Sequence, residues 1–193
     1  KRSELRIVYF EVDVKKWAEE PPSVGAVRPG RCPCCGAAGA GRRLGLVGHG
    51  VRERQVLGPL SASGKPEQVV LLVRRYRCRG CGAIVMSMPR GMLRRMLYGA
   101  VAVGMALALW VQGAASAAVR QRVSPWLSAG SERFHGWRSL RRWAARAAGL
   151  WRGLRLDATQ PLGRARQVVS QLAARAVSPS GPLALLVAQG ALR

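Results

Sequence analysis

Two short cysteine-bearing stretches decide the fold of this chain: Arg31-Cys32-Pro33-Cys34-Cys35-Gly36 and Arg77-Cys78-Arg79-Gly80-Cys81-Gly82. Each contains a pair of thiols in C-x2-C spacing with a glycine directly after the second thiol. A pair at this spacing can chelate a metal ion from one turn, and two pairs complete a tetrahedral zinc site. Residues 42–58 and 68–77 between them read as two strands, joined by a tip rich in Gly, Ser and Pro at residues 58–66. The pattern predicts a zinc ribbon.

The predicted ligands of a structural Zn²⁺ are the four thiolates of Cys32, Cys35, Cys78 and Cys81. Four protein thiolates leave no open coordination position, so we expect the metal to support the fold rather than to catalyse a reaction. Cys34 can replace Cys32 or Cys35 as a ligand, or remain a free thiol. His49 and His135 have no ligand spacing to a cysteine, and we expect surface or hairpin positions for both.

The charge of the chain is strongly unbalanced, with 32 Lys and Arg residues against 9 Asp and Glu residues and a formal net charge of +23. Such an excess repels itself in a compact protein, and a polyanion relieves the repulsion. Nucleic acid is the commonest polyanion partner. A compositional bias toward arginine is the alternative explanation, but it does not account for so few acidic residues. Nearly all of the excess lies in residues 31–193.

The residues on either side of the ribbon have simpler signals. Residues 5–12 are rich in β-branched and aromatic side chains and predict a strand, after which Asp13 can cap a short helix over residues 14–20. Residues 23–30 read as a linker, and residues 84–89 as a short extended exit from the ribbon. The odd number of cysteines and a charged N-terminus without an apolar signal segment indicate a metal site in the cytoplasm rather than a disulfide framework.

Helical periodicity begins after residue 90. Apolar residues recur at three- and four-residue steps from Met92 to Trp110, and Gly113 is expected to end this helix. A second helix is predicted over residues 115–122, and a third from residue 134 or 136 to residue 148. The tail adds an amphipathic helix and a short apolar helix that either packs back on the fold or frays, over residues 163–177 and 183–192.

The third helix carries the clearest candidate surface for nucleic acid. Arg138, Arg142 and Arg146 are four positions apart and share one face, with Arg141 beside them. Arginines on a helix that packs on a core can reach phosphates or guanine edges in a DNA groove. A solvated charged face is the alternative, but such faces mix signs, and residues 133–156 contain no acid.

Further candidate contacts lie on the preceding helix and on the basic strand that enters the second cysteine stretch. The full set of candidate DNA contacts is Arg74, Arg75, Arg120, Arg122, Arg138, Arg141, Arg142 and Arg146.

The order of these parts resembles bacterial zinc-ribbon/helix-turn-helix proteins, which are similar to the N-terminal DNA-binding regions of insertion-sequence transposases. The likeness covers roughly residues 30–150 and is carried by the cysteine stretches and by residues 106–110, 117–126 and 137–143. It implies that residues 120–123 end a positioning helix and that residues 137–143 begin a recognition helix. It also implies association with a mobile element and a recombinase or transposase subunit as partner.

Two departures from this family pattern are visible in the sequence. The connection over residues 124–133 is longer than the short turn of the common helix-turn-helix motif. The residues of this chain do not include the catalytic domain that follows in a transposase, so we expect no recombination activity from this chain alone.

These observations predict an α+β protein: a four-cysteine zinc ribbon of antiparallel strands, followed by a helix-turn-helix-like bundle. The expected parts are an N-terminal arm, the ribbon, the bundle and a helical tail, over residues 1–30, 31–90, 91–150 and 151–193. The predicted function is non-catalytic DNA binding, for a mobile element or as a transcriptional regulator. Scattered acids without a nucleophile or a phosphate-binding loop argue against an enzyme.

Two alternatives to DNA binding remain. Basic zinc ribbons also bind RNA or ribonucleoprotein. The second alternative is membrane association, because residues 96–119 contain no charge and are long enough to span a bilayer. Glycines at 99, 104 and 113 interrupt that segment, so we expect a buried helix pair there instead.

Overall fold

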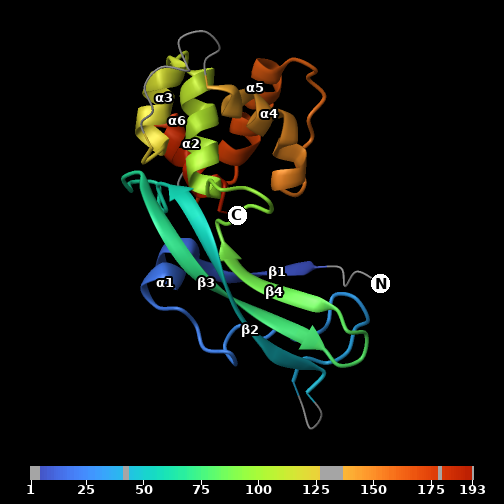
Figure 1. Cartoon of the computed structure of the whole chain (residues 1–193). Coiled ribbons are helices and arrows are strands. Elements are labelled where there is room, and N and C mark those ends of the chain that lie inside the picture. The colour runs from blue at the N-terminus through green and yellow to red at the C-terminus, as the bar shows by residue number, and fades with distance from the viewer. Residues whose placement is uncertain (1–4, 41–43, 127–136, 178–179, 193) are drawn as a thin grey trace. The chain divides into compact units, whose positions relative to one another are not determined.

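The computed structural model describes residues 5–40, 44–126, 137–177 and 180–192, and its fold is α+β (Figure 1). The chain divides into two compact units. The sheet unit comprises Lys1–Gln55 and Val69–Arg90, and the helical unit comprises Val56–Gln68 and Gly91–Arg193. The expected arm over residues 1–30 therefore lies in the same unit as both cysteine stretches, and the expected tail lies in the same unit as the helices before it.

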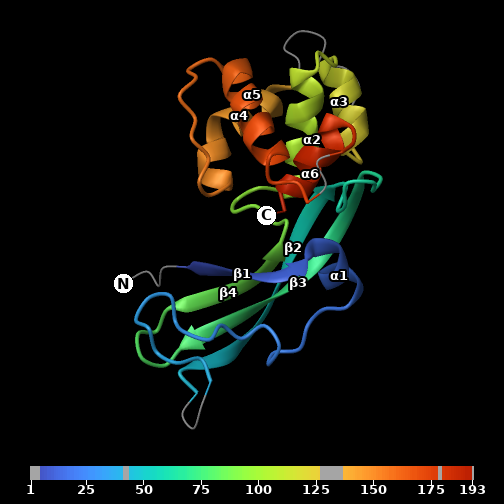
Figure 2. The ribbon, with the colours of Figure 1, turned by 180° about the vertical axis from the view of Figure 1, so that it is seen from behind.

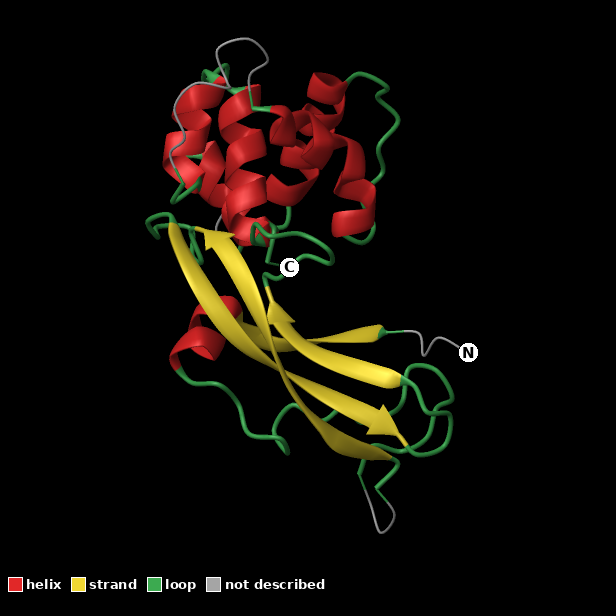
Figure 3. Ribbon diagram, in the orientation of Figure 1, coloured by secondary structure: helices red, strands yellow, loops and turns green. Residues whose placement is uncertain are grey.

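Four strands form one sheet with the spatial order β1-β4-β3-β2 (Figure 3). Their bounds are Arg6–Asp13 for β1, Leu46–Gly58 for β2, Glu67–Cys78 for β3 and Ile84–Arg90 for β4. Strands β3 and β4 are antiparallel, with Tyr76 opposite Val85, whereas β1 joins β4 in parallel, with Tyr9 opposite Met88. The three predicted strands are confirmed, with the start of β2 at Leu46.

The predicted short exit after the second cysteine stretch is instead a full strand, β4, which pairs with β3 on one side and β1 on the other. The reason lies in the turn that precedes it. The chain reverses between Arg77 and Ile84, and these two residues pair directly, so the residues that follow are laid alongside β3. A chain placed there satisfies its backbone N–H and C=O groups by joining the sheet.

The N-terminal residues continue from β1 into α1, Val14–Glu19, as predicted. Asp13 caps this helix, because its carboxylate oxygen accepts a hydrogen bond from the backbone N–H of Lys16 at 2.8 Å. The indole N–H of the buried Trp17 donates to the carbonyl of Leu72 in β3 at 3.0 Å. The short helix is thus capped by the last residue of β1 and tied to β3 through the indole of Trp17.

The segment after α1, expected as a linker, crosses one face of the sheet (Figure 2). Side chains of β3 and β4 donate to its carbonyl oxygens: Tyr76 to Val24 at 2.7 Å and Ser87 to Val27 at 2.7 Å. Tyr76 and Ser87 are fully buried beneath this segment. Because both buried hydroxyl groups have partners, the segment is an integral cover of the sheet.

The helical unit is built around α2, Ala100–Val111, which packs against all four of its other helices. These are α3, α4, α5 and α6, with bounds Ser116–Val123, Arg138–Leu150, Pro161–Ala173 and Leu183–Gly190. Every residue of α2 from Ala100 to Ala108 is buried, as expected for a core helix that is apolar on all sides. Within the described ranges, no helix is both long enough and apolar enough to cross a membrane.

Gly113 separates α2 from α3, as predicted. It has φ +89°, and its N–H donates to the carbonyl of Trp110 at 3.1 Å. The N–H of Ala114 donates to the carbonyl of Leu109 at 3.0 Å. This pair of bonds is the Schellman motif, in which a glycine in the left-handed region closes the helix. The uncharged segment therefore divides into two helices.

The prediction that the first helix begins at Met92 is wrong, because α2 begins at Ala100. Residues 91–99 run as an extended and turning segment that pairs with Leu57: the N–H of Leu57 donates to Leu97 at 2.9 Å, and Leu57 accepts from Gly99 at 3.1 Å. Arg95 has φ +58°, which an α-helix does not permit. The apolar spacing over these residues reflects burial against the core rather than a helix.

The tail packs into the core of the helical unit. Val168 and Leu172 of α5 and Val187 of α6 are fully buried in the same hydrophobic cluster as α2. The indole N–H of Trp151 donates to the carbonyl of Ala191 at 3.0 Å and ties the end of α4 to the end of α6. At Gly190, a Cβ atom would lie 1.7 Å from the carbonyl oxygen of Leu172, so α5 and α6 meet there without room for a side chain.

We predict that Gly190→Ala destabilises the protein by about 1–3 kcal/mol, because the added methyl group forces α6 away from the end of α5. Gly149→Ala is the matched control: Gly149 lies in α4 with nothing within 4 Å of its missing Cβ. This substitution should be neutral or stabilise by about 0.5–1 kcal/mol through helix propensity. Urea unfolding followed by circular dichroism measures both, and equal effects would contradict the close α5–α6 packing.

Candidate metal centre

The two cysteine stretches fold into turns with the same backbone hydrogen bonds. We call them knuckle 1, residues 31–38, and knuckle 2, residues 77–84. The first cysteine of each donates its N–H to the carbonyl of the alanine five positions later: Cys32 to Ala37 at 2.8 Å and Cys78 to Ala83 at 2.9 Å. The residues flanking each turn also pair in the same way, Arg31 with Ala38 and Arg77 with Ile84.

The glycine after each pair of thiols closes its turn. Gly36 has φ +74° and Gly82 has φ +73°, a region that residues with a Cβ atom seldom adopt. The N–H of Gly36 donates to the carbonyl of Cys32 at 2.9 Å, and the N–H of Gly82 donates to that of Cys78 at 2.9 Å. The shared motif R-C-x-x-C-G-A therefore encodes the same turn twice.

The turns bring four sulfur atoms together, those of Cys32, Cys35, Cys78 and Cys81, all within 4.8 Å of one another. Across the two knuckles, the Sγ atoms of Cys32 and Cys81 are 3.8 Å apart and those of Cys35 and Cys78 are 3.6 Å apart. These separations are much longer than a disulfide bond. A tetrahedral ion with metal–sulfur bonds of about 2.3 Å places its ligand atoms about 3.8 Å apart. The spacing thus fits a four-thiolate metal site.

The electrostatics of the group favour a cation at its centre. The backbone N–H of Cys81 points at the sulfur of Cys78 and is the main cause that lowers the pKa of Cys78 to about 7. The N–H of Ala83 lowers the pKa of Cys81, but desolvation and the neighbouring thiols outweigh it and raise that pKa to about 12. Without a metal ion, neighbouring thiolates repel each other, so deprotonation of one thiol makes deprotonation of the others less favourable. A bound cation offsets the repulsion between the thiolates. The backbone N–H groups that point at the sulfurs then stabilise these thiolate ligands further.

Gly45, which was not among the predicted site residues, connects the two knuckles through its backbone. The N–H of Gly45 donates to the carbonyl of Ala38 at 3.0 Å, and the carbonyl of Gly45 accepts from the N–H of Arg79 at 2.8 Å. A Cβ atom at position 45 would lie 2.3 Å from the carbonyl oxygen of Ala38. Nothing in the sequence marks Gly45 for this role, because the role arises only when β2 starts between the two turns.

Burial divides the four cysteines into two kinds. Cys32 and Cys78, the first of each pair, are buried in a small core with Tyr76 and Val85, whereas Cys35 and Cys81 are exposed. The candidate metal centre is therefore continuous with the core of the sheet unit on one side and reaches solvent on the other. Four cysteines that lie this close can bind a metal ion, and they leave no position open for a substrate.

The remaining candidate ligands lie apart from this group. Cys34 is exposed, and its N–H points at the sulfur of Cys32 at 3.5 Å, so it supports the turn through its backbone. Its thiol does not belong to the group of four. His49 is exposed on β2, and His135 lies outside the described residues.

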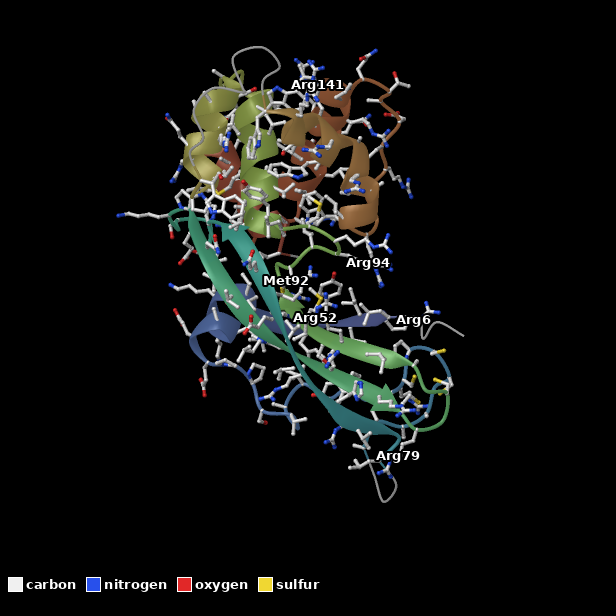
Figure 4. All side chains as sticks on the ribbon, in the orientation of Figure 1. Arg6, Arg52, Arg79, Met92, Arg94 and Arg141 are labelled. Carbon is white, nitrogen blue, oxygen red and sulfur yellow. The ribbon has the colours of Figure 1, made fainter. Side chains whose placement is uncertain are left out.

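The candidate DNA contacts are spread over both units. On α4, Arg138, Arg141, Arg142 and Arg146 are all exposed, and Figure 4 shows Arg141 pointing away from the helices. On α3, Arg122 is exposed, whereas Arg120 is half-buried.

The two candidates on β3 are placed differently. Arg74 is half-buried, and its Nε donates to the carbonyl of Pro22 at 3.1 Å, which gives it a structural role in holding the covering segment. Arg75 is also half-buried, with its Nε shielded from solvent. Among the described residues of the sheet unit, exposed arginines lie at the knuckles, where they include Arg77 and Arg79, and on β2 at Arg52; Figure 4 labels Arg79 and Arg52.

Comparison of the chain with protein-family models, curated proteins and solved structures yields no match.

We predict that the purified chain binds one metal ion and that Cys81→Ser abolishes this binding. The sheet unit should then unfold, because the two knuckles lose the ion that joins them. Cys34→Ser is the matched control, since it removes an exposed thiol from the same turn as Cys32 and Cys35. It should leave metal content and stability unchanged. Elemental analysis and thermal unfolding under reducing conditions measure both variants, and metal loss in the Cys34 variant would contradict the ligand assignment.

Proposed function

We propose that this chain is a non-catalytic DNA-binding protein in which a structural zinc ion stabilises the sheet unit and α4 contacts the phosphates of duplex DNA. The observation that carries the proposal is the one-sided charge of α4. Arg138, Arg142 and Arg146 are exposed along one face, and the helix contains no acidic residue. Like charges four positions apart destabilise an isolated helix, and a polyanion bound along that face removes the penalty.

The opposite face of α4 anchors the helix. Leu140, Trp143, Ala144 and Ala147 are buried in the core of the helical unit. At the start of the helix the rings of Tyr98, Trp137 and Trp143 pack edge to face, with centroid separations from 4.8 to 5.8 Å. Aromatic packing of this kind restricts rotation of the helix about its axis. The backbone positions that carry the exposed arginines are therefore fixed on the solvent side of the helix, as groove recognition requires.

Charge is less balanced in the helical unit than in the sheet unit. Counted along the sequence, the helical unit holds 16 Lys and Arg residues against 3 Asp and Glu residues, and the sheet unit holds 16 against 6. Most acids of the sheet unit lie in residues 1–20, where Glu11 pairs with Arg90 and Glu19 with Lys15. This distribution favours the helical unit as the main surface for binding a polyanion.

Zinc is the metal that we propose for the four-thiolate site. A closed set of four thiolates suits Zn²⁺, which has no redox chemistry and accepts tetrahedral geometry at the observed sulfur spacing. Iron is the other metal that four thiolates bind in this geometry. Elemental analysis distinguishes the two, and iron in place of zinc would replace the structural role with electron transfer.

The resemblance to zinc-ribbon/helix-turn-helix proteins supports the same function. In that arrangement α3 would be the positioning helix and α4 the recognition helix, and a recombinase or transposase subunit would be the protein partner. Much of the connection between these helices, residues 127–136, lies outside the described residues. The mobile-element role rests on the sequence resemblance alone.

The test is the salt dependence of duplex DNA binding by the variant R138A/R142A/R146A. Each lost phosphate contact should reduce the slope of log affinity against log salt by about 0.9, so we expect a decrease of about 2–3 for the triple variant. The matched control is R152A/R155A/R166A, which removes the same charge from exposed positions of the same unit outside α4. It should change the slope less.

Equal slopes for the two triple variants would show that net charge, and not the face of α4, drives the binding. Structured RNA is the competitor in the same assay, and we expect it to displace duplex DNA poorly. If RNA binds more tightly than DNA, the proposal of DNA binding is replaced by the RNA alternative.

A further inference from the structure

Trp126, just beyond the end of α3, is an exposed aromatic residue whose polar groups all have hydrogen-bond partners. Its side chain keeps 46% of its surface accessible to solvent. The other tryptophans that belong to the cores, Trp17, Trp143 and Trp151, are at most 5% exposed. Single exposed apolar side chains are common on protein surfaces, so the distinctive feature of Trp126 is the set of hydrogen bonds that holds it in place.

Hydrogen bonds fix every polar group of Trp126. The indole N–H donates to the side-chain carbonyl of Gln68 at 3.0 Å, and the backbone N–H donates to Ser124 Oγ at 3.2 Å. The backbone carbonyl accepts from Arg120 Nε at 3.1 Å and from Ser124 Oγ at 3.2 Å. The ring is thus oriented before any partner arrives, which lowers the entropic cost of using it in binding.

Ser124 connects this arrangement to the core. It is 2% exposed, and its hydroxyl also lies 2.8 Å from the hydroxyl of Tyr98. Tyr98 in turn packs against Trp143, on the buried side of α4. The buried contacts of Ser124, Tyr98 and Trp143 therefore connect the exposed ring of Trp126 to the basic helix α4.

The surroundings of Trp126 are basic and polar. Arg120 and Arg122 lie in the last turn of α3, and Arg122 and Gln121 are exposed. An oriented aromatic face beside guanidinium groups matches the chemistry of a nucleotide, which presents a flat base and an anionic phosphate. A protein partner would favour an apolar surround, which α3 does not offer at its exposed positions near this end.

We infer that Trp126 is a stacking platform for an unpaired nucleobase, with Arg122 as the neighbouring phosphate contact. This inference rests on the proposed DNA-binding function and makes it more specific. Bases inside a duplex are already stacked, and separating them is costly. The protein should therefore prefer duplex DNA that ends in a short single strand over blunt duplex DNA of the same length.

The experiment compares binding of blunt and overhung duplexes by the wild-type chain and by Trp126→Ala, Trp126→Leu and Trp126→Phe. We expect about tenfold tighter binding of the overhung duplex by the wild type, the size of one base stacked on an aromatic ring. Trp126→Ala and Trp126→Leu should lose this preference, and Trp126→Phe should keep most of it. The salt slope should stay the same in all of them, because stacking releases no counterions.

Trp126→Leu keeps the apolar bulk, so a loss of preference in a folded Leu variant identifies the aromatic face as the cause. Tyr9→Ala is the matched control, since it removes a similarly exposed ring, 44% accessible, from the sheet unit. It should retain the preference.

Equal binding of blunt and overhung duplexes by the wild type would overturn the stacking inference and leave DNA binding intact. An unchanged preference in Trp126→Leu would do the same. If Trp126→Ala instead dissociates a dimer without changing DNA affinity, Trp126 is a protein contact and the inference is wrong. Failure of the wild type to bind any DNA would overturn both this inference and the proposed function.

Discussion

The approach of four cysteine sulfurs to within 4.8 Å of one another is the constraint on which the sheet unit depends. Two turns with the same hydrogen bonds create it, and each needs a glycine in the left-handed region, Gly36 in one and Gly82 in the other. The second turn also lays β4 beside β3, which gives β1 its place at the edge of the sheet. Because four sulfurs at this spacing cannot all carry negative charge unaided, a cation bound among them would stabilise the fold of this unit.

The features that depend on local sequence were predictable. The spacing of the cysteines identified the group that the structure brings together, Asp13 identified the cap of α1, and Gly113 identified the end of α2. Features that depend on tertiary contacts were not. Residues 91–99 have helical apolar spacing but pair with Leu57 instead, and residues 23–30 look like a linker but receive hydrogen bonds from buried side chains of the sheet. Gly45 carries no local signal, since its role comes from two turns that are distant in the sequence, and the partner of the Trp126 indole N–H, Gln68, is likewise distant from it.

The structure separates the metal chemistry from the proposed recognition of DNA. The clustered thiols lie in the sheet unit, and the exposed arginines of α4 lie in the helical unit. The two are linked covalently, because the end of the β2–β3 hairpin, residues 56–68, belongs to the helical unit while both knuckles belong to the sheet unit. The side-chain carbonyl of Gln68 at that end accepts a hydrogen bond from the indole N–H of Trp126, so the same hairpin contributes to the surface that we propose for nucleotides. In this account the metal acts on binding through folding.

Photo-cross-linking to a duplex that carries 5-bromouracil, with mass spectrometry to identify the linked peptides, tests directly whether α4 is the surface that contacts DNA. This cross-link forms only over short distances, so it reports which element lies beside the bases. We expect linked peptides from Arg138–Leu150, with none from the sheet unit beyond the two knuckles. Cross-links confined to the sheet unit, with α4 unmodified, would contradict the proposed contact of α4 with DNA.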